Sequence, residues 1–307
     1  MSKLTAVAYY AGIPPNNKNP EKPLILDYFC QGVNSCGDTA TAHRGFNAIG
    51  CDVALIQGFV HEDGKNMPHL NLRKQALELQ KNNGKKSLIV DSNLFLFADP
   101  GNSKHYLRYS FNGVFPTTGF YFDKDIDPMR WQKISKNLNI HMRPYRQIGN
   151  HILICLQRNG GWSMKGLNSL VWLNETINTI KQYSDRKIIV RAHPGDKKTQ
   201  GFIKLHHKNV ILSQQEKLTD DLLDAWATVV YNSSPSVASL IMGVPAFLTD
   251  PTPENSQSFG AANLDISKIE TPTLFERQQW IEKISMCHWN FDELRSGEAW
   301  AFFKRYV

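Results

Sequence analysis

Three short polar segments of the chain carry side chains that can bind an anion, and each directly follows an apolar run. They read QRNGGWS at 157–163, RAHP at 191–194 and YNSSPS at 231–236. Arginine and histidine can donate to a phosphate, adjacent glycines let the backbone approach a ligand, and a helix start attracts negative charge. The residues that we expect to bind a phosphate-bearing ligand are Arg158, Gly160, Gly161, Arg191, His193, Ser233, Ser234 and Ser236. The alternatives are a solvated turn at the first segment, a structural histidine at the second and helix capping at the third.

The apolar runs before these segments belong to a regular alternation of expected strands and helices. The strands are 151–157, 187–190, 209–213, 227–231 and 245–249, and the helices are 167–183, 197–207, a short one opening at 219, and 237–242. Short apolar strands that alternate with helices are typical of a parallel sheet. Ligands bind such sheets at the carboxyl ends of the strands, so we expect the three segments to converge on one ligand.

The first half of the chain has a similar but less regular pattern. Its expected strands are 4–10, 24–29, 51–59 and 87–90, and its expected helices are 67–81 and 123–138. The aromatic, glycine-rich stretch 95–121 is expected to form loops or a hairpin. A polar stretch at 141–147 separates the two patterns, and helices rich in Trp and Phe are expected over 273–285 and 291–306. The chain is therefore expected to be an α/β protein of two domains.

Two of the polar segments, in their order along the chain, resemble a known family. Residues 191–194 (RAHP), followed by 229–245 (VVYNSSPSVASLIMGVP), look like the nucleotide-sugar half of GT-B glycosyltransferases, nearest to the capsule-type and the sialyl- or Kdo-transferase groups. The resemblance implies two Rossmann-like parallel-sheet domains facing a cleft. It also implies that His193 contacts the nucleotide, that Ser233 and Ser234 hold the donor phosphate, and that a carboxylate such as Glu254 or Asp250 holds the ribose.

The resemblance covers only part of the chain, and the first half has no counterpart in it. It implies an acceptor-binding domain over 1–145, a nucleotide-sugar-binding domain over 146–285, and a C-terminal helix within 286–307 that crosses back to the first domain. The sialyltransferase group also carries an acidic pair followed by glycine. Only 61–64 (HEDG) has that form here, which makes Asp63 a candidate.

Glycosyl transfer needs a group that stabilises the leaving phosphate and a base for the acceptor hydroxyl. No D-x-D pair follows a strand, and GT-B enzymes generally need no metal. We therefore expect a metal-independent transferase without a cofactor, whose co-substrate is a nucleotide-sugar, with a UDP-sugar favoured. The candidates for the base are Asp38, slightly favoured because Gly37 and nearby hydroxyls suggest a ligand loop, with His43 assisting, and Asp91, which follows the strand at 88–90.

The net charge of the chain bears on which acceptor it could bind. The 307-residue chain has a net charge of +7, which is compatible with a polyanionic partner. Arg44, Arg108, Tyr109 and Asn112 could bind a phosphodiester backbone and stack a flipped base, although a core hairpin with scattered charge is the alternative. The compact size and the aromatic tail at 289–300 look like transferases of tailed phages, which implies 5-hydroxymethylcytosine in double-stranded phage DNA as the acceptor. Transfer to a cell-surface polysaccharide, or a non-catalytic nucleotide- or nucleic-acid-binding protein, are the alternative functions.

The amino-acid composition indicates the class of protein and the compartment in which it works. The chain has 41% hydrophobic and 21% charged residues, the balance of a globular protein. Five cysteines without C-x-x-C spacing argue against disulfides and a cysteine-built zinc site. The sequence has neither an apolar stretch of membrane-spanning length nor a secretory signal, which predicts a cytoplasmic protein, in the host cytoplasm if it is viral.

Overall fold

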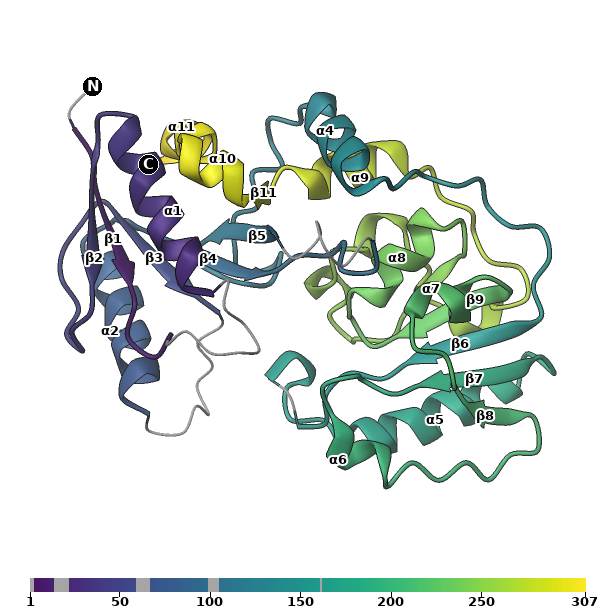
Figure 1. Cartoon of the computed structure of the whole chain (residues 1–307). Coiled ribbons are helices and arrows are strands. Elements are labelled where there is room, and N and C mark those ends of the chain that lie inside the picture. The colour runs from purple at the N-terminus through teal and green to yellow at the C-terminus, as the bar shows by residue number, and fades with distance from the viewer. Residues whose placement is uncertain (1–2, 14–21, 59–66, 99–104, 161) are drawn as a thin grey trace. The chain divides into compact units, whose positions relative to one another are not determined.

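The computed structural model describes residues 3–13, 22–58, 67–98, 105–160 and 162–307. The chain forms two compact units (Figure 1). Unit 1 comprises Met1–Asn93, Pro100–Asp127 and Ile284–Val307, and unit 2 comprises Leu94–Asp99 and Pro128–Lys283. Among the described residues, no helix is long and apolar enough to cross a membrane.

Unit 1 is built on a six-stranded sheet with the order β11-β5-β4-β3-β1-β2. Its strands are β1 (Thr5–Tyr9), β2 (Thr39–His43), β3 (Val53–Gln57), β4 (Lys86–Ser92), β5 (Tyr106–Phe111) and β11 (His288–Asn290). The strands β1 to β4 are parallel, as expected for a Rossmann-like domain. The edge formed by β5 and β11 is antiparallel.

The helices of unit 1 are α1 (Lys22–Ser35), α2 (Pro68–Asn82), α10 (Phe291–Ser296) and α11 (Glu298–Phe303), with a 3-10 turn over Lys304–Tyr306. The expected strand at 24–29 is wrong, because this stretch is the first half of α1. Ile25, Leu26, Phe29 and Val33 are buried, and this spacing places them on one face of a helix. A short apolar run cannot be assigned to a strand or a helix by periodicity alone.

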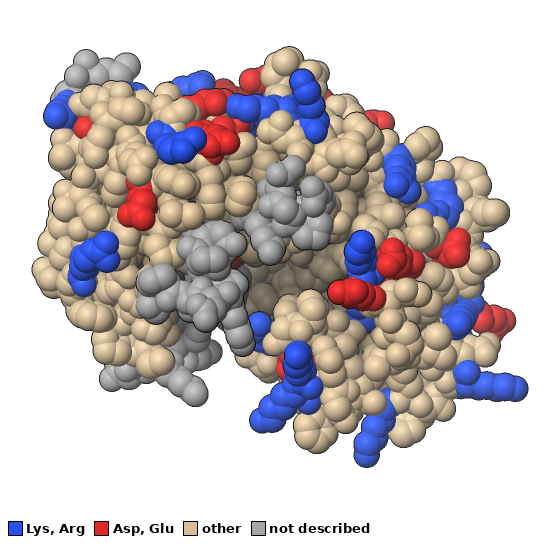
Figure 2. Space-filling view, in the orientation of Figure 1, with Lys and Arg blue, Asp and Glu red and all other residues tan. Residues whose placement is uncertain are grey.

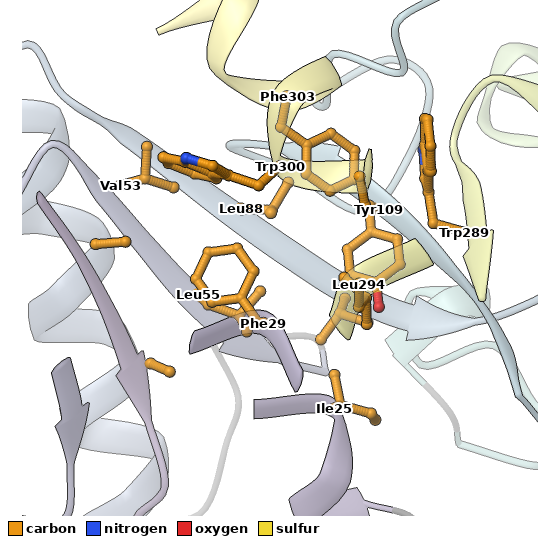
Figure 3. Packing of buried hydrophobic residues seen from close by; sticks show 14 of the residues in the cluster. Ile25, Phe29, Val53, Leu55, Leu88, Tyr109, Trp289, Leu294, Trp300 and Phe303 are labelled. Atoms are coloured by element: carbon orange, nitrogen blue, oxygen red, sulfur yellow. The ribbon is translucent and has the colours of Figure 1, made fainter. Parts of the chain in front are cut away.

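The C-terminal segment completes the core of unit 1 (Figure 3). Trp300 and Phe303 pack against aromatic side chains of α1 and β5, with ring centroids of Trp300 and Phe29 5.7 Å apart and those of Phe303 and Tyr109 5.4 Å apart. The helices α1 and α10 approach so closely that a Cβ on Gly32 would lie 1.9 Å from the carbonyl oxygen of Leu294. A side chain at position 32 would therefore force the two helices apart.

Unit 2 is built on a five-stranded parallel sheet with the order β10-β9-β6-β7-β8. The strands are β6 (His151–Cys155), β7 (Lys187–Arg191), β8 (Val210–Leu212), β9 (Ala225–Val230) and β10 (Ala246–Leu248). The helices are α4 (Pro128–Leu138), α5 (Ser169–Lys181), α6 (Lys197–Gln200), α7 (Leu218–Leu222), α8 (Pro235–Ile241) and α9 (Gln278–Ser285). The five expected strands of this half are all present, and the expected α/β class is confirmed.

Candidate functional site

The three polar segments lie after β6, β7 and β9 of unit 2, at the carboxyl edge of one sheet. The central strand is β6, which pairs in parallel with β7 on one side and with β9 on the other. The segments at 157–160, 192–196 and 231–234 therefore leave the sheet side by side. This is the edge at which open parallel sheets bind their ligands.

His193 is held as a neutral donor at this edge. Its Nδ1 accepts a hydrogen bond from the backbone N–H of Gly195 at 3.0 Å, so the proton of the neutral ring is on Nε2. Burial lowers the pKa of His193, the positive charge of Arg158 lowers it further, and Asp196 opposes this shift. At neutral pH the imidazole therefore offers an uncharged Nε2–H to a ligand.

Arg158 lies against the same loop. A Cβ added to Gly195 would be 2.8 Å from Nη2 of Arg158 and 3.2 Å from Cε1 of His193. Arg158 is exposed, and within the described ranges no ion pair engages its guanidinium. His193 and the residue before Arg158, Gln157, line a shallow hollow together with Leu156, Ala192, Asp196, Thr199, Gln200 and Ile203. Arg158 from the first segment and His193 from the second are thus brought together.

A polar clamp fixes the end of β9 to its neighbours. The backbone N–H of Asn232 donates to Oε1 of Gln157, and Nε2 of Gln157 donates back to Oδ1 of Asn232, both at 3.0 Å. Nδ2 of Asn232 donates to Oδ2 of the buried Asp250 at 2.6 Å. The sequence did not identify Gln157 and Asn232 as positioning residues, although each lies two residues after the end of a buried strand. Asp250, a candidate for the ribose by resemblance, belongs to this clamp instead.

The hydroxyl pair of the third segment is not used for capping. Ser234 precedes α8 and makes no side-chain capping hydrogen bond. Oγ of Ser233 is buried and has no hydrogen-bond partner among the described residues. Ser236 is buried in unit 2, where its Oγ contacts Oγ of Ser258 at 2.6 Å and the carbonyl of Ser233 at 2.7 Å, so its role is structural. The hydroxyls of Ser233 and Ser234 are therefore not engaged by a described hydrogen bond, whereas that of Ser236 is.

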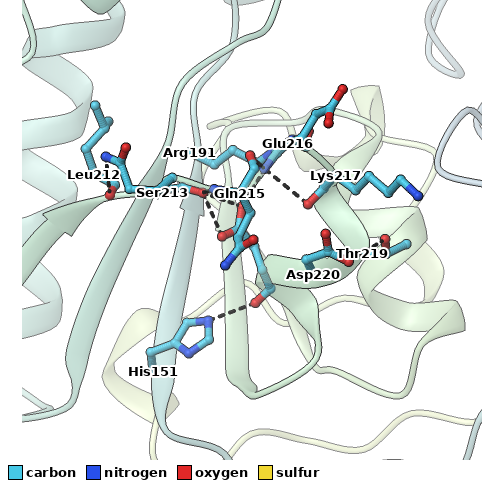
Figure 4. A network of polar contacts seen from close by, with 11 residues as sticks. His151, Arg191, Leu212, Ser213, Gln215, Glu216, Lys217, Thr219 and Asp220 are labelled. Carbon is cyan, nitrogen blue, oxygen red and sulfur yellow. Dashed lines mark hydrogen bonds and ion pairs between the residues drawn. The ribbon is translucent and has the colours of Figure 1, made fainter.

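Arg191 is a structural residue, which corrects its expected role in anion binding (Figure 4). Its Nη1 pairs with Oδ2 of Asp221 at 2.5 Å, and its guanidinium also donates to the backbone carbonyls of Gln215, Glu216 and Lys217. These contacts hold the segment between β8 and α7 to the end of β7. The donors of Arg191 are therefore engaged within the protein.

The remaining candidates of unit 2 lie at the periphery. Gly160 has a φ of 63°, a left-handed conformation that glycine adopts without strain, and a Cβ there would meet open space. Glu254 is exposed on the 3-10 turn Pro253–Asn255. Gly161 and, in the first half of the chain, Asp63 lie outside the described residues.

The buried His151 predicts acid sensitivity in unit 2. Its Nε2 contacts the carbonyl of Asp221 at 2.8 Å, and burial lowers its pKa despite this hydrogen bond. Below the ordinary histidine pKa of about 6.5, the unfolded chain binds a proton that the folded chain does not. The free energy of unfolding therefore decreases as the pH is lowered. We expect His151→Gln to make the fall in thermal midpoint between pH 7 and pH 5 shallower, measured by circular dichroism. A His206→Gln control at an exposed position should leave the profile unchanged.

Asp38 lies at the amino end of β2, away from the carboxyl edge of the sheet in unit 1. Its Oδ2 accepts from Nε1 of Trp300 at 2.7 Å and from Nζ of Lys304 at 3.2 Å, and its Oδ1 accepts from the backbone of Leu4. Burial tends to raise its pKa, but these hydrogen bonds hold the pKa below the usual value. The favoured choice of Asp38 as the base is therefore replaced by a structural role.

We expect Asp38→Asn to lower the free energy of unfolding by about 1–3 kcal/mol at pH 7, because an amide is a weaker acceptor for Trp300 and Lys304. The contribution of a carboxylate with a depressed pKa is present above its unfolded pKa and is lost as pH falls through its folded pKa. The difference between the two proteins should therefore shrink in acid. Urea unfolding at several pH values checks this, with the exposed Asp185→Asn as control. An equal stability of wild type and Asp38→Asn at pH 7 would contradict the structural role.

Asp91 and His43 do lie at the carboxyl edge of the sheet in unit 1, but on strands that are not neighbours. Asp91 is the penultimate residue of β4 and pairs with Nη2 of Arg108 at 2.8 Å. His43 ends β2, and its buried Nε2 has no hydrogen-bond partner in the described part of the chain. Because β3 and β1 separate β4 from β2, the two side chains do not form a catalytic pair.

The expected acceptor-binding residues are mostly structural. Arg108 is paired with Asp91, Tyr109 is fully buried, and Asn112 exchanges hydrogen bonds with Ser87 at a turn. The hairpin alternative is therefore the correct one for this stretch. Only Arg44 is exposed, with its guanidinium 4.6 Å from the ring centroid of Tyr10. On the face seen in Figure 2, the Lys and Arg side chains drawn in colour are scattered among uncharged and acidic residues.

Comparisons with known proteins address the fold. No protein-family model matches the chain, and no curated protein matches it by sequence. A solved structure of Thermosulfurimonas dismutans KpsC, a beta Kdo 2,4 transferase, is similar with a TM-score of 0.59 and 13% identity, over 94% of this chain and 91% of that one. A second, KpsC beta Kdo 2,7 transferase of the same organism, has a TM-score of 0.56 and 12% identity, over 97% and 99%. The chain therefore has the GT-B-like fold of these two structures.

Proposed function

We propose that this protein is a glycosyltransferase that binds a nucleotide-activated sugar at the carboxyl edge of the unit 2 sheet. The observation that carries the proposal is the meeting of His193, with its neutral Nε2–H, and the guanidinium of Arg158 beside one loop. A cation and an N–H donor at this edge suit the phosphate of a nucleotide. The similarity of fold to two structures named as Kdo transferases supports the same function.

In the proposed site, each side chain has a separate task. Arg158 and His193 bind the phosphates, and their positive charge and N–H group stabilise the charge that develops on the leaving nucleotide. The unpartnered Oγ of Ser233 adds a hydrogen bond. The exposed Glu254 is our candidate for the ribose hydroxyls. Gln157 and Asn232 do not touch the ligand in this scheme. Their hydrogen bonds fix the ends of β6 and β9, where the ligand-binding residues lie.

The acceptor is proposed to be a hydroxyl of a glycan. Base recognition in DNA would require aromatic and basic side chains at the surface, but Tyr109 is in the core and Arg108 is ion-paired. A cell-surface polysaccharide was the alternative acceptor in the sequence analysis. The two structures of similar fold are named as Kdo transferases. Asp91, which lies at the carboxyl edge of its own sheet, is our candidate for the base that accepts the proton of the hydroxyl.

The test has a donor arm and an acceptor arm. Isothermal titration with UDP, CMP and their sugar conjugates should reveal binding to one nucleotide class, and the absence of binding to all of them would overturn the donor site. The protein is then incubated with the bound donor and either a panel of oligosaccharide glycosides or hydroxymethylated duplex DNA, and the products are analysed by mass spectrometry. Sugar on a glycoside supports the proposal, whereas sugar on the DNA would overturn the glycan acceptor.

A further inference from the structure

Arg73 is a half-buried cation without a described partner. It lies in α2, and among the described residues no hydrogen bond or ion pair reaches its guanidinium. Burial alone lowers its pKa, with no described carboxylate acting in the opposite direction. Removing a charge from water without pairing it is unfavourable, so such an arginine is unusual in a purely structural role.

The head of Arg73 lies at the carboxyl edge of the sheet in unit 1. A Cβ on Gly58, the residue after β3, would be 3.6 Å from Nη1 of Arg73. Gly58 is fixed there by a hydrogen bond from its N–H to the carbonyl of Val90 on β4, at 2.8 Å. The guanidinium therefore lies beside the end of β3, on the edge where the parallel strands of this sheet deliver ligand-binding groups.

Two uncharged polar groups lie near the guanidinium of Arg73. The preceding residue of Gly58, Gln57, has a buried Oε1, an acceptor, without a described hydrogen-bond partner at the same strand end. His69, one turn before Arg73 on α2, has its pKa lowered by burial and by Arg73. It is therefore neutral at pH 7 and can offer an N–H without adding charge. The described carboxylates at this edge are engaged, since Asp91 pairs with Arg108 and Asp27 accepts from Tyr10.

We propose that Arg73 binds an anionic group of the acceptor, a carboxylate or a phosphate carried by the glycan, at the end of β3. The planar guanidinium can donate two parallel hydrogen bonds to either group. This inference rests on the proposed function for the identity of the ligand as an acceptor. It makes a negatively charged glycan, rather than a neutral one, the substrate class of unit 1.

The thermal midpoint of an Arg73 variant distinguishes a ligand-binding arginine from a structural one. If the bare protein holds an uncompensated charge, Arg73→Gln removes an unfavourable burial, and its thermal midpoint equals or exceeds that of the wild type. If a partner in the protein neutralises Arg73, the same substitution lowers the midpoint, and the proposal is overturned. Arg73→Lys keeps the charge and serves as the second variant, and Lys81→Gln, exposed on the last turn of the same helix, is the matched control.

The binding test uses three probes on the full chain at constant ionic strength: methyl glucuronide, glucose 6-phosphate and neutral methyl glucoside. Affinities are measured by ligand-observed NMR, with and without saturating nucleotide in unit 2. We expect at least one anionic probe to bind in both conditions, the neutral probe to bind more weakly, and Arg73→Gln to reduce the anion affinity about tenfold or more. Arg73→Lys keeps the charge but not the planar fork and should lose less affinity than Arg73→Gln, and Lys81→Gln should lose none.

Three results would overturn the proposal: equal binding of neutral and anionic probes, an anion affinity unchanged by Arg73→Gln, or complete displacement of the anion by nucleotide. The relative affinities of the glucuronide and the phosphate distinguish the two anion sources. Because the anion arm needs no donor, it can succeed even if no nucleotide binds. A failure of the proposed function is thereby separated from a failure of the Arg73 site.

Discussion

Replacing Arg158 and His193 together with alanine is expected to reduce the affinity for the nucleotide-sugar by roughly a hundredfold or more. Each substitution removes a charge-assisted or half-buried hydrogen bond, with a loss of about 1–3 kcal/mol in binding free energy. The two residues contact the same loop at Gly195, so their effects are not expected to add fully. Calorimetric titration of the single and double variants measures both the loss and the coupling.

The controls for this prediction follow from the geometry. His193→Gln retains a neutral N–H donor and should lose less affinity than His193→Ala. Lys187→Ala removes an exposed positive charge from the amino end of β7, the strand that precedes His193, and should have little effect. If Lys187→Ala weakened binding as much as Arg158→Ala, a general attraction of anions would explain the data, and the specific site would be excluded.

Trp300→Ala is expected to destabilise unit 1 by about 4 kcal/mol, enough to unfold much of it at moderate temperature. The side chain is 1% exposed, packs edge-on against Phe29, and donates its indole N–H to Asp38. Alanine leaves a large cavity and also removes a donor from a carboxylate that is shielded from water. Chemical unfolding, with the midpoint and slope compared between variants, measures the loss.

Trp300→Phe separates the two contributions, because it retains most of the ring volume but lacks the N–H. We expect this variant to lose about 1–2 kcal/mol. Phe202→Ala, at a side chain that is 62% exposed in unit 2, should change stability by less than about 0.5 kcal/mol. An effect of Trp300→Ala no larger than that of Trp300→Phe would mean that the cavity collapses without cost.

The second half of the chain was predictable because its strands are short, mostly apolar and separated by helical patterns. His151–Cys155 is buried at every position, and its helical neighbours repeat apolar residues at a clear period. The first half mixes these signals. The run at 24–29 has the composition of a strand, and only its continuation to Val33 on one helical face distinguishes it as α1. The short strand β11 is defined by its pairing with β5, a contact between residues far apart in the sequence.

The candidate site was partly predictable for a related reason. The position of His193 after a strand follows from the local pattern, and so does its proximity to Arg158 after the neighbouring strand. The direction of a long side chain does not follow, because it depends on partners elsewhere. Arg191 turns to Asp221, thirty residues further along the chain, and Asp38 is bound by Trp300. Such contacts leave no trace in local spacing.

Unit 1 is assembled from both ends of the chain, and this affects the order in which the two units can fold during synthesis. Residues 284–307 supply the edge strand β11 and the helices α10 and α11 to a core whose other strands lie before residue 112. During synthesis, the whole of unit 2 emerges from the ribosome before this last piece. Unit 2 can therefore fold before unit 1 is complete. Until residues 284–307 are synthesised, the aromatic side chains of α1 and β5 that they cover remain exposed. A message truncated after codon 283 would thus yield a nascent chain with the unit 2 sheet intact and an open, aggregation-prone edge in the unit encoded first.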